Sequence, residues 1–380
     1  MWRLAWRDWR AVWKAGVALL LHTIRSPASA AGSREHAVVS ARRILGEQSF
    51  VAVDVGAALG LLPHWEALDR IAEIYQVEPR QDACRELAKA NARRAEPGRY
   101  HVMDAALSEH GGTCALYVSN APTGTSLFHI DPALSRDCAD YVDLTYLYPI
   151  TEVQLETTTL AQLLGSVDQP QADLIKLDVQ GLELPILRGM GDERLDGLLG
   201  VEVEIGLHDL YPQDVGFEAM TSLLKKYGFE LFDLRTSRVH RPLDGDHAGY
   251  QKKIFEVYAH SPTISARIWE LDAVYFKRKS ILLERKDPLE IRRMALVYSV
   301  YNFFSEAYAL VEMAQGEGIF PDAEAAALKR EIVTLHRQQH YRAWLADSAI
   351  LEWFRRKMYR IAPRSVPRWC QYMYQDYPNG

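Results

Sequence analysis

Short apolar runs that end in an acidic residue recur along the first half of the chain. The first is Val51-Ala52-Val53-Asp54-Val55, and it is followed by Gly56 and Gly60. A β-branched run of this length predicts a buried parallel strand that turns sharply into a helix. Glycine in such a turn permits a positive φ angle and a close approach between backbone and ligand. We therefore expect Asp54 at the carboxyl end of a strand, where open α/β sheets bind ligands.

Two more runs follow with the same arrangement. Ile71–Val77 leads into Glu78-Pro79, and Arg99–Met103 leads into Asp104. A helical pattern over Gln81–Arg94 separates them, so the alternation predicts βα units. Glu78 lies 24 residues past Asp54. At about this spacing a carboxylate typically accepts hydrogen bonds from the hydroxyl groups of a ribose. The glycine spacing alone is also compatible with an ordinary turn, and it matches neither a dinucleotide fingerprint nor a P-loop.

The pattern continues with two strands and a hairpin. Leu174–Leu177 is predicted to place Asp178 at the same sheet edge, with Glu183 on the following helix. The strand Leu199–Ile205 carries Glu202 and Glu204 on one face because strand side chains alternate. These two glutamates are compatible with an ion pair or with a substrate contact. The predicted hairpin pairs Phe229–Leu234 with Ile254–Ala259, and the long loops His129–Tyr148 and Arg235–Gln251 are expected to bind substrate.

The two ends of the chain have a different character. Residues 1–25 predict a basic amphipathic helix that carries Trp2, Trp6, Trp9 and Trp13 on one stripe. This stripe is compatible with packing on the body or a second subunit, and with an anchor at a membrane surface. Beyond residue 262 the segment Trp269–Phe276 is compatible with the edge of the core. From Asp287 on the periodicity is helical, which predicts an extension that braces the core, forms a homodimer interface or carries substrate.

Composition narrows the function classes. The 380 residues are 48% hydrophobic and 25% charged, with a net charge of −6, which is typical of a globular protein and argues against a nucleic-acid partner. The four cysteines are isolated in the sequence, so neither a zinc site nor a disulfide framework is indicated. We expect no metal and a reducing compartment, which favours the cytoplasm, with the inner membrane surface as an alternative site for residues 1–25.

The order of these motifs resembles the FkbM family of class I S-adenosylmethionine-dependent O-methyltransferases, from about Phe50 to His260. The matching segments are Asp54-Val55-Gly56-Ala57 with Gly60, Glu78-Pro79, Ala106-Leu107-Ser108, Gly111-Gly112, Thr125-Ser126-Leu127, Thr159-Leu160, Leu174 to Glu183, Val201 to Glu204 and Tyr227-Gly228-Phe229. Two positions depart from the family pattern. Ala58 stands where the family usually has asparagine, and Gln180 stands where it has glutamate. Losing the asparagine amide removes a hydrogen bond worth roughly 0.5–1.5 kcal/mol.

The resemblance implies an α/β fold with a seven-stranded, mostly parallel, doubly wound Rossmann-like sheet. It implies three regions: residues 1–48 with the N-terminal helix and a connector, the methyltransferase domain over 49–262, and a C-terminal helical extension over 263–380. The implied cofactor is S-adenosyl-L-methionine. The residues expected to bind it are Asp54, Gly56, Ala57, Gly60, Glu78, Asp104, Ala105 and Asp178.

The same resemblance predicts methyl transfer to a hydroxyl group of a small molecule or glycan, with a sugar as the expected acceptor. A base must remove the hydroxyl proton, and His208 is the candidate because its ordinary pKa suits proton transfer at neutral pH. Asp178 is the second catalytic candidate, for orienting the cofactor or the acceptor. The alternative is a catalytically silent binding or scaffold module, which the departures at Ala58 and Gln180 favour.

Overall fold

The computed structural model describes residues 37–119, 124–130, 144, 147–167, 171–207, 216–239 and 267–347. Residues 1–25, His208 and Ile254–Ala259 lie outside these ranges, so the predictions made for them stay predictions. Within the ranges described, no helix is both long enough and apolar enough to cross a membrane.

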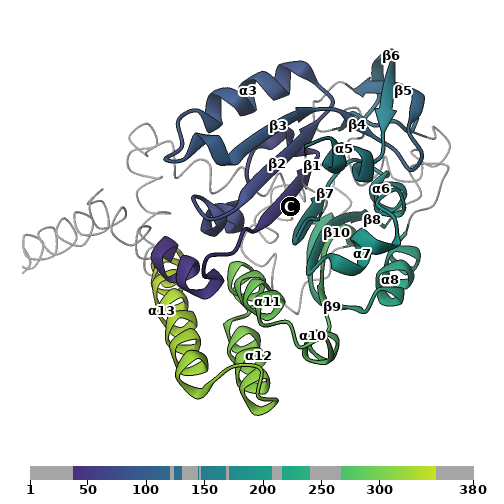
Figure 1. Ribbon diagram of the computed structural model, residues 1–380. Coiled ribbons are helices and arrows are strands. Elements are labelled where there is room, and N and C mark those ends of the chain that lie inside the picture. The colour runs from purple at the N-terminus through teal and green to yellow at the C-terminus, as the bar shows by residue number, and fades with distance from the viewer. Residues whose placement is uncertain are drawn as a thin grey trace, which may run out of the picture.

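A twisted seven-stranded sheet forms the centre of the molecule (Figure 1). Its strand order is β3-β2-β1-β7-β8-β10-β9, and the first five strands of that order are parallel. The strands span β1 Val51–Val55, β2 Glu73–Glu78, β3 Tyr100–Asp104, β7 Leu174–Leu177, β8 Gly200–Gly206, β9 Phe229–Val239 and β10 Arg267–Lys277. The predicted fold class is confirmed.

The last two strands differ from the sequence-based expectation. β10, Arg267–Lys277, runs antiparallel between β8 and β9, so the strand that pairs with β9 lies beyond Ile254–Ala259. The sheet therefore continues past residue 262, the expected domain boundary, and Trp269–Phe276, which was compatible with the core's edge, lies within it. β9 also extends to Val239, so residues 235–239 are strand and not loop. Alternation in Arg267–Lys277 was visible in the sequence, but its distance from β9 hid the pairing.

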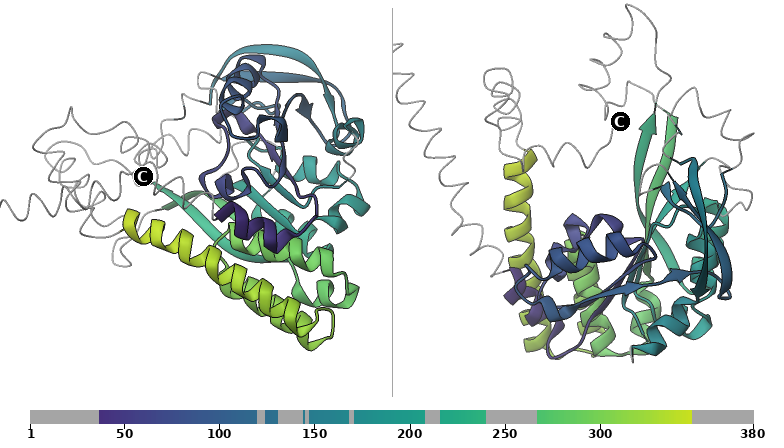
Figure 2. Two further views of the ribbon diagram at one scale, coloured as in Figure 1. Left: turned by 60° about the vertical axis from the view of Figure 1, so that its left-hand side comes forward. Right: turned by 90° about the horizontal axis from the view of Figure 1, so that it is seen from above.

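Helices cover both faces of the sheet (Figures 1 and 2). One face packs on α5 Leu160–Ser166, α6 Glu183–Arg188, α7 Asp192–Gly197 and α8 Phe217–Lys226. A capping box opens α5, because the Thr159 hydroxyl accepts from the Gln162 amide and the Gln162 side chain accepts from the Thr159 amide. α3, Gln81–Asn91, packs beside β2 and β3 at the sheet's edge.

The C-terminal helices cover the opposite face. Between β1 and β2 the chain forms only two short 3-10 helices, η1 Ala57–Leu59 and η2 Pro63–Leu68. The space beside them is filled by α11 Pro288–Val300, which packs against α12 Phe304–Gly316 and α13 Asp322–Asp347. α10 Lys279–Arg285 lies next to α11 and α12. Ile291, Met294 and Val297 of α11 share one buried cluster with Ala52 of β1 and Leu174 of β7. The extension is thus part of the core, as the bracing role predicted.

A second, smaller sheet lies above one end of the main sheet. It has the order β4-β6-β5, formed by β4 Ala106–Leu107, β6 Pro149–Thr158 and β5 Gly112–Ser119. A bridge between Tyr117 and Ser126 folds the segment 124–130 back onto β5. This sheet was not predicted, because its strands enter the chain as an insertion between β3 and α5.

Candidate functional site

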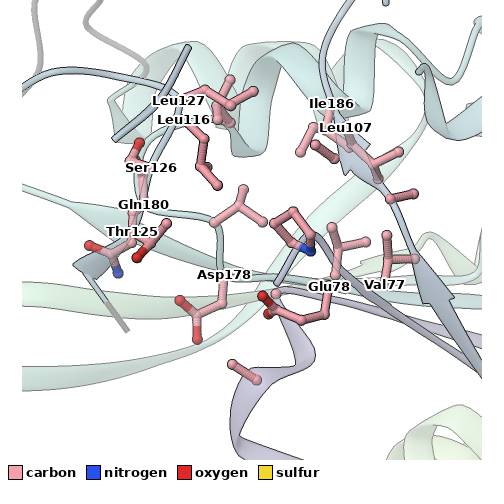
Figure 3. A pocket seen from close by; sticks show the side chains of 18 of the residues that line it. Val77, Glu78, Leu107, Leu116, Thr125, Ser126, Leu127, Asp178, Gln180 and Ile186 are labelled. Carbon is pink, nitrogen blue, oxygen red and sulfur yellow. The ribbon is translucent and has the colours of Figure 1, made fainter. Parts of the chain in front are cut away.

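A cavity opens at the carboxyl ends of β1, β2 and β7 (Figure 3). Its wall is formed by the loops that follow these strands, by residues 105–107 and by residues 125–127 of the inserted segment. Glu78 and Asp178 lie on one side of it, whereas Leu116 and Leu127 lie on the opposite side. The cavity is therefore polar on its strand side and apolar beneath the small sheet.

Gly56 sets the shape of the cavity floor. Its φ angle is +82°, and its amide donates to the Val77 carbonyl oxygen at 3.0 Å. A Cβ atom at this position would lie 1.8 Å from the Asp178 carbonyl oxygen. Only glycine fits there, because both the left-handed backbone and the contact with the β7 loop exclude a side chain.

Glu78 occupies the end of β2 at the cavity wall. Its side chain is buried, and its Oε1 atom accepts from the Arg80 amide at 2.9 Å. Burial raises the pKa of Glu78, although the Arg80 amide and guanidinium act in the opposite direction. A carboxylate held in this way at the tip of the second strand can accept two neighbouring hydroxyl groups of a ribose.

Apolar side chains line the part of the cavity next to Glu78. Val77 and Leu107 lie at this end, with Ile186 of α6 close by (Figure 3). Ala105 and Ala106 complete the wall with small side chains. This surface suits the faces of a planar aromatic ring such as adenine.

Asp54 lies below the cavity and does not line it. It is the fourth residue of β1, so its side chain points to the face of the sheet, where it is fully buried. Its Oδ1 atom is 3.5 Å from the Lys176 ammonium nitrogen, which also donates to Asp178 at 3.1 Å. Burial raises the pKa of Asp54, and the positive charge of Lys176 opposes this shift. Asp54 therefore holds Lys176 beneath the site.

The loop after β7 is tightly held. Both Glu183 carboxylate oxygens accept from the Gly181 amide, and Oε1 also accepts from the Val179 amide at 2.9 Å. Gln180 has a φ angle of +56°, its carbonyl oxygen accepts from the Ser126 hydroxyl at 2.8 Å, and its side chain donates to Glu204 at 2.9 Å. These bonds place Asp178 and Gln180 at the end of the cavity opposite Val77 and Leu107 (Figure 3).

The two glutamates of β8 share a face of the sheet but have different partners. Glu202 is buried and accepts from Tyr301 at 2.7 Å and from Arg235 at 3.1 Å, and it bonds His64 at 2.8 Å. Burial alone would raise the pKa of Glu202, but these donors outweigh it and lower the pKa. Glu202 thus belongs to an ion-pair network that joins η2, β9 and the segment after α11.

The structure brings together four of the predicted cofactor residues, namely Gly56, Glu78, Ala105 and Asp178. The other four do not line the cavity. Asp54 and Ala57 are buried in the fold, Gly60 lies at the end of η1, and Asp104 is exposed at the end of β3. Strand alternation explains Asp54 and Asp104, since a side chain near a strand's end points to a sheet face and not along the strand.

Sequence reasoning missed Leu116, Thr125, Ser126 and Gln180 as lining residues. Thr125-Ser126-Leu127 was among the motifs that carried the family resemblance, and that was the available signal. The bond between Ser126 and Gln180 crosses 54 residues of chain, so no local pattern predicts it.

The fold is that of a class I S-adenosylmethionine-dependent methyltransferase. Residues 54–231 match the methyltransferase FkbM domain, so the protein carries an FkbM methyltransferase domain, and the resemblance is confirmed. The cofactor of this family is S-adenosyl-L-methionine. Comparison with curated protein sequences gave no match.

Similar solved structures are distant in sequence. A methyltransferase FkbM from Methylobacillus flagellatus is 12% identical with a TM-score of 0.32, over 61% of this chain and 45% of that chain. This chain thus spans less than half of that protein's length. A putative RNA methyltransferase from Pyrococcus horikoshii is 12% identical with a TM-score of 0.26, over 67% of this chain and 85% of that chain. A glycopeptide N-methyltransferase solved with S-adenosylmethionine is 9% identical with a TM-score of 0.25, over 63% of this chain and 87% of that chain.

Proposed function

We propose that this methyltransferase is an O-methyltransferase that acts on a hydroxyl group of a sugar in a polysaccharide, glycolipid or secondary metabolite. The observation that carries the proposal is the cavity at the carboxyl ends of β1, β2 and β7, which Glu78 and Asp178 both line. The acceptor class rests on the FkbM domain, whose family methylates such hydroxyls.

The residues of the cavity fit the cofactor. Glu78 would hold the ribose hydroxyls, the wall around Leu107 and Ile186 would contact adenine, and the floor at Gly56 would lie next to the methionine part. S-adenosylmethionine supplies the methyl group as a sulfonium, so the carbon–sulfur bond breaks with its electron pair on sulfur as the acceptor oxygen bonds to carbon. The protein then has to place the acceptor oxygen and remove its proton.

Two residues are proposed for these tasks. Asp178 lines the cavity and is fixed by Lys176, so it can orient the sulfonium by its negative charge or accept a hydrogen bond from the acceptor hydroxyl. His208 follows β8 by two residues and is proposed as the base.

The partners proposed from the sequence are a glycan or small-molecule acceptor, a membrane surface for residues 1–25, and a second copy of the chain.

The alternative function is a silent binding or scaffold module. It was suggested by Ala58 and Gln180, which both line the cavity. The Gln180 side chain donates to Glu204, and a small alanine leaves the cavity open, so neither departure blocks a ligand. Cofactor affinity separates the two functions, because an enzyme must bind S-adenosylmethionine and a scaffold need not.

Isothermal titration with S-adenosylmethionine and S-adenosylhomocysteine tests the proposal. We expect micromolar binding by the wild-type protein and a loss of about tenfold or more in Glu78→Ala, which removes a charged hydrogen-bond acceptor. Glu86→Gln, on the exposed side of α3, is the matched control and should bind normally. An absence of binding by the wild-type protein would favour the scaffold function. Vesicle co-sedimentation with and without residues 1–25 tests the membrane contact.

A further inference from the structure

The face of the sheet below the cavity changes from apolar to polar along the strands. At the amino ends of the parallel strands, Ala52 and Leu174 join the core under α11. Two to four residues further on, the same face carries Asp54, Lys176 and Asp178, since alternate residues point to one side. The carboxyl edge of the sheet therefore places Asp178 at the cavity, with Asp54 and Lys176 below it.

Asp178 and Glu204 are neighbours on this polar face. β7 and β8 are parallel, and Leu177 pairs with Val203, so the residues that follow them lie side by side. Gln180 donates to Glu204 Oε2 at 2.9 Å, and Lys176 donates to Asp178 Oδ2 at 3.1 Å. Each carboxyl group of the pair is thus fixed by a donor from β7 or its loop.

Two carboxyl groups that are direct neighbours disfavour being ionised together, so the pair favours retaining one proton. Burial and the charge of Asp178 raise the pKa of Glu204 well above its ordinary value. Burial would also raise the pKa of Asp178, but Lys176 and the hydrogen bond with Glu204 outweigh it and lower the pKa. A protonated Glu204 that donates to an ionised Asp178 satisfies both groups. Deprotonating Glu204 would place a second negative charge beside the first.

Other charged groups surround the pair in the described part of the chain, and two of them have pKa values near neutrality. Burial raises the pKa of Asp272 to about 7 and that of Glu183 to about 7. The groups that face the pair or its neighbours are Asp54 on β1, Lys176 on β7, Glu202 on β8, Glu270 and Asp272 on β10, Arg235 on β9, Glu183 on α6 and His64 on η2. A test of the pair therefore has to distinguish the titration of Glu204 from that of the neighbouring carboxyl groups.

We propose that Asp178 and Glu204 form a negatively charged pair that selects the positively charged methyl donor over its uncharged product, with Asp178 at the cavity and Glu204 as the positioning residue whose proton sets the charge of the pair. The inference rests on the proposed function, because it assumes that the cavity binds S-adenosylmethionine. S-adenosylmethionine is a sulfonium cation, whereas S-adenosylhomocysteine is a neutral thioether. The negative charge of the pair favours the cation. After methyl transfer the ligand's sulfur has lost its positive charge, so the product dissociates more readily.

The selectivity depends on the proton of Glu204. As the pH rises and Glu204 loses its proton, the pair gains negative charge, so affinity for the cation should increase relative to the thioether. A positive charge near a carboxyl group shifts its pKa by about one unit or more, which by linkage corresponds to about tenfold in relative affinity. The ratio of the two affinities should therefore rise by about tenfold between its acid and alkaline limits.

The experiment measures both dissociation constants by isothermal titration at a series of pH values around neutrality. The wild-type ratio should rise with pH, whereas Glu204→Gln should show a flat ratio and retain its affinity for S-adenosylhomocysteine, which also shows that it is folded. Dividing the wild-type ratio by the variant ratio at each pH cancels the titration of the ligands' own amino groups. Asp178→Asn should weaken binding of the cation more than binding of the thioether.

Control variants assign the effect. Asp272→Asn, Glu270→Gln and Glu183→Gln should each keep the rise of the ratio with pH. If one of them abolishes the rise while Glu204→Gln keeps it, that residue and not the pair selects the cation. If both ligands bind and the wild-type ratio is independent of pH, the inference is wrong while the proposed function stands. If neither ligand binds, the proposed function itself fails.

Discussion

Gly56 and Asp178 approach each other so closely that a Cβ atom on Gly56 would lie 1.8 Å from the Asp178 carbonyl oxygen. The two residues follow adjacent parallel strands, and the Asp178 amide donates to the Val55 carbonyl oxygen at 3.1 Å. This contact joins the loops after β1 and β7 and fixes the floor of the cavity. It has a direct consequence for mutation.

Gly56→Ala should abolish cofactor binding and destabilise the protein by more than about 1 kcal/mol. The added methyl group must displace the β7 loop, and the φ angle of +82° is unfavourable for alanine. Gly98→Ala is the control, because a Cβ there meets nothing within 4 Å. Denaturant unfolding and titration with S-adenosylhomocysteine measure the two effects. Normal binding by Gly56→Ala would contradict the geometry.

Ser126→Ala should loosen the segment that covers the cavity. The Ser126 hydroxyl donates to the Gln180 carbonyl oxygen at 2.8 Å and accepts from the Phe128 amide at 2.9 Å. Loss of these two bonds removes the side-chain hydrogen bond between Ser126 and the β7 loop, so bound S-adenosylhomocysteine should dissociate several-fold faster. Stopped-flow displacement measures the rate. The exposed Ser166→Ala is the control, and equal rates in the two variants would show that the link is unimportant.

Tyr301→Phe should lower the free energy of unfolding by about 1–3 kcal/mol. The Tyr301 hydroxyl donates to buried Glu202 at 2.7 Å and accepts from the Trp65 indole nitrogen at 3.0 Å. Removing this hydroxyl takes the hydrogen-bond acceptor away from the buried Trp65 indole nitrogen. It also takes one hydrogen bond away from the buried Glu202 carboxylate. Tyr308→Phe, on the outer side of α12, should change the free energy by less than about 0.5 kcal/mol. Similar losses in both variants would exclude a special role for the network.

Glu183 should make the protein less stable as the pH rises. Burial raises its pKa in the folded protein to about 7 from an ordinary value of 4.5. Between these pH values the unfolded chain has released the proton and the folded chain retains it, so the free energy of unfolding falls with rising pH. The total effect is on the order of 3 kcal/mol. Glu183→Gln should show a shallower fall than wild type in unfolding curves measured across this range, whereas Glu193→Gln on the exposed side of α7 should not.

His208→Ala should lower the rate of methyl transfer to a sugar acceptor by roughly 10²-fold or more if His208 is the base. The loss should appear in kcat, while the affinity for S-adenosylmethionine stays the same. An unchanged rate would remove His208 from the mechanism.

The central strands could be predicted because local composition determines them. Leu174–Leu177 was found with the predicted bounds, and Val51–Val55 is the β-branched run that opens the domain. Both are buried on two faces, so their apolar character is continuous. The role of Gly56 was also predictable, because the close approach of another backbone segment directly after a strand leaves no room for a side chain.

The parts that escaped prediction depend on contacts between distant segments. Asp54 was expected at the ligand, but it pairs with Lys176 on the neighbouring strand. β10 joins the sheet between β8 and β9, although the local sequence of Arg267–Lys277 does not indicate which strands it pairs with. The same holds for Glu204, whose protonation depends on Asp178 across two strands.

The C-terminal helices have a consequence for how the protein is made. Residues 54–231, which carry the family signature, leave one face of β1 and β7 without its cover, because that cover is supplied by α11, which begins at Pro288. During synthesis this face stays exposed until the later part of the chain has left the ribosome. The core therefore closes only after α11 has been synthesised, because residues 54–231 alone lack the helix that buries this face.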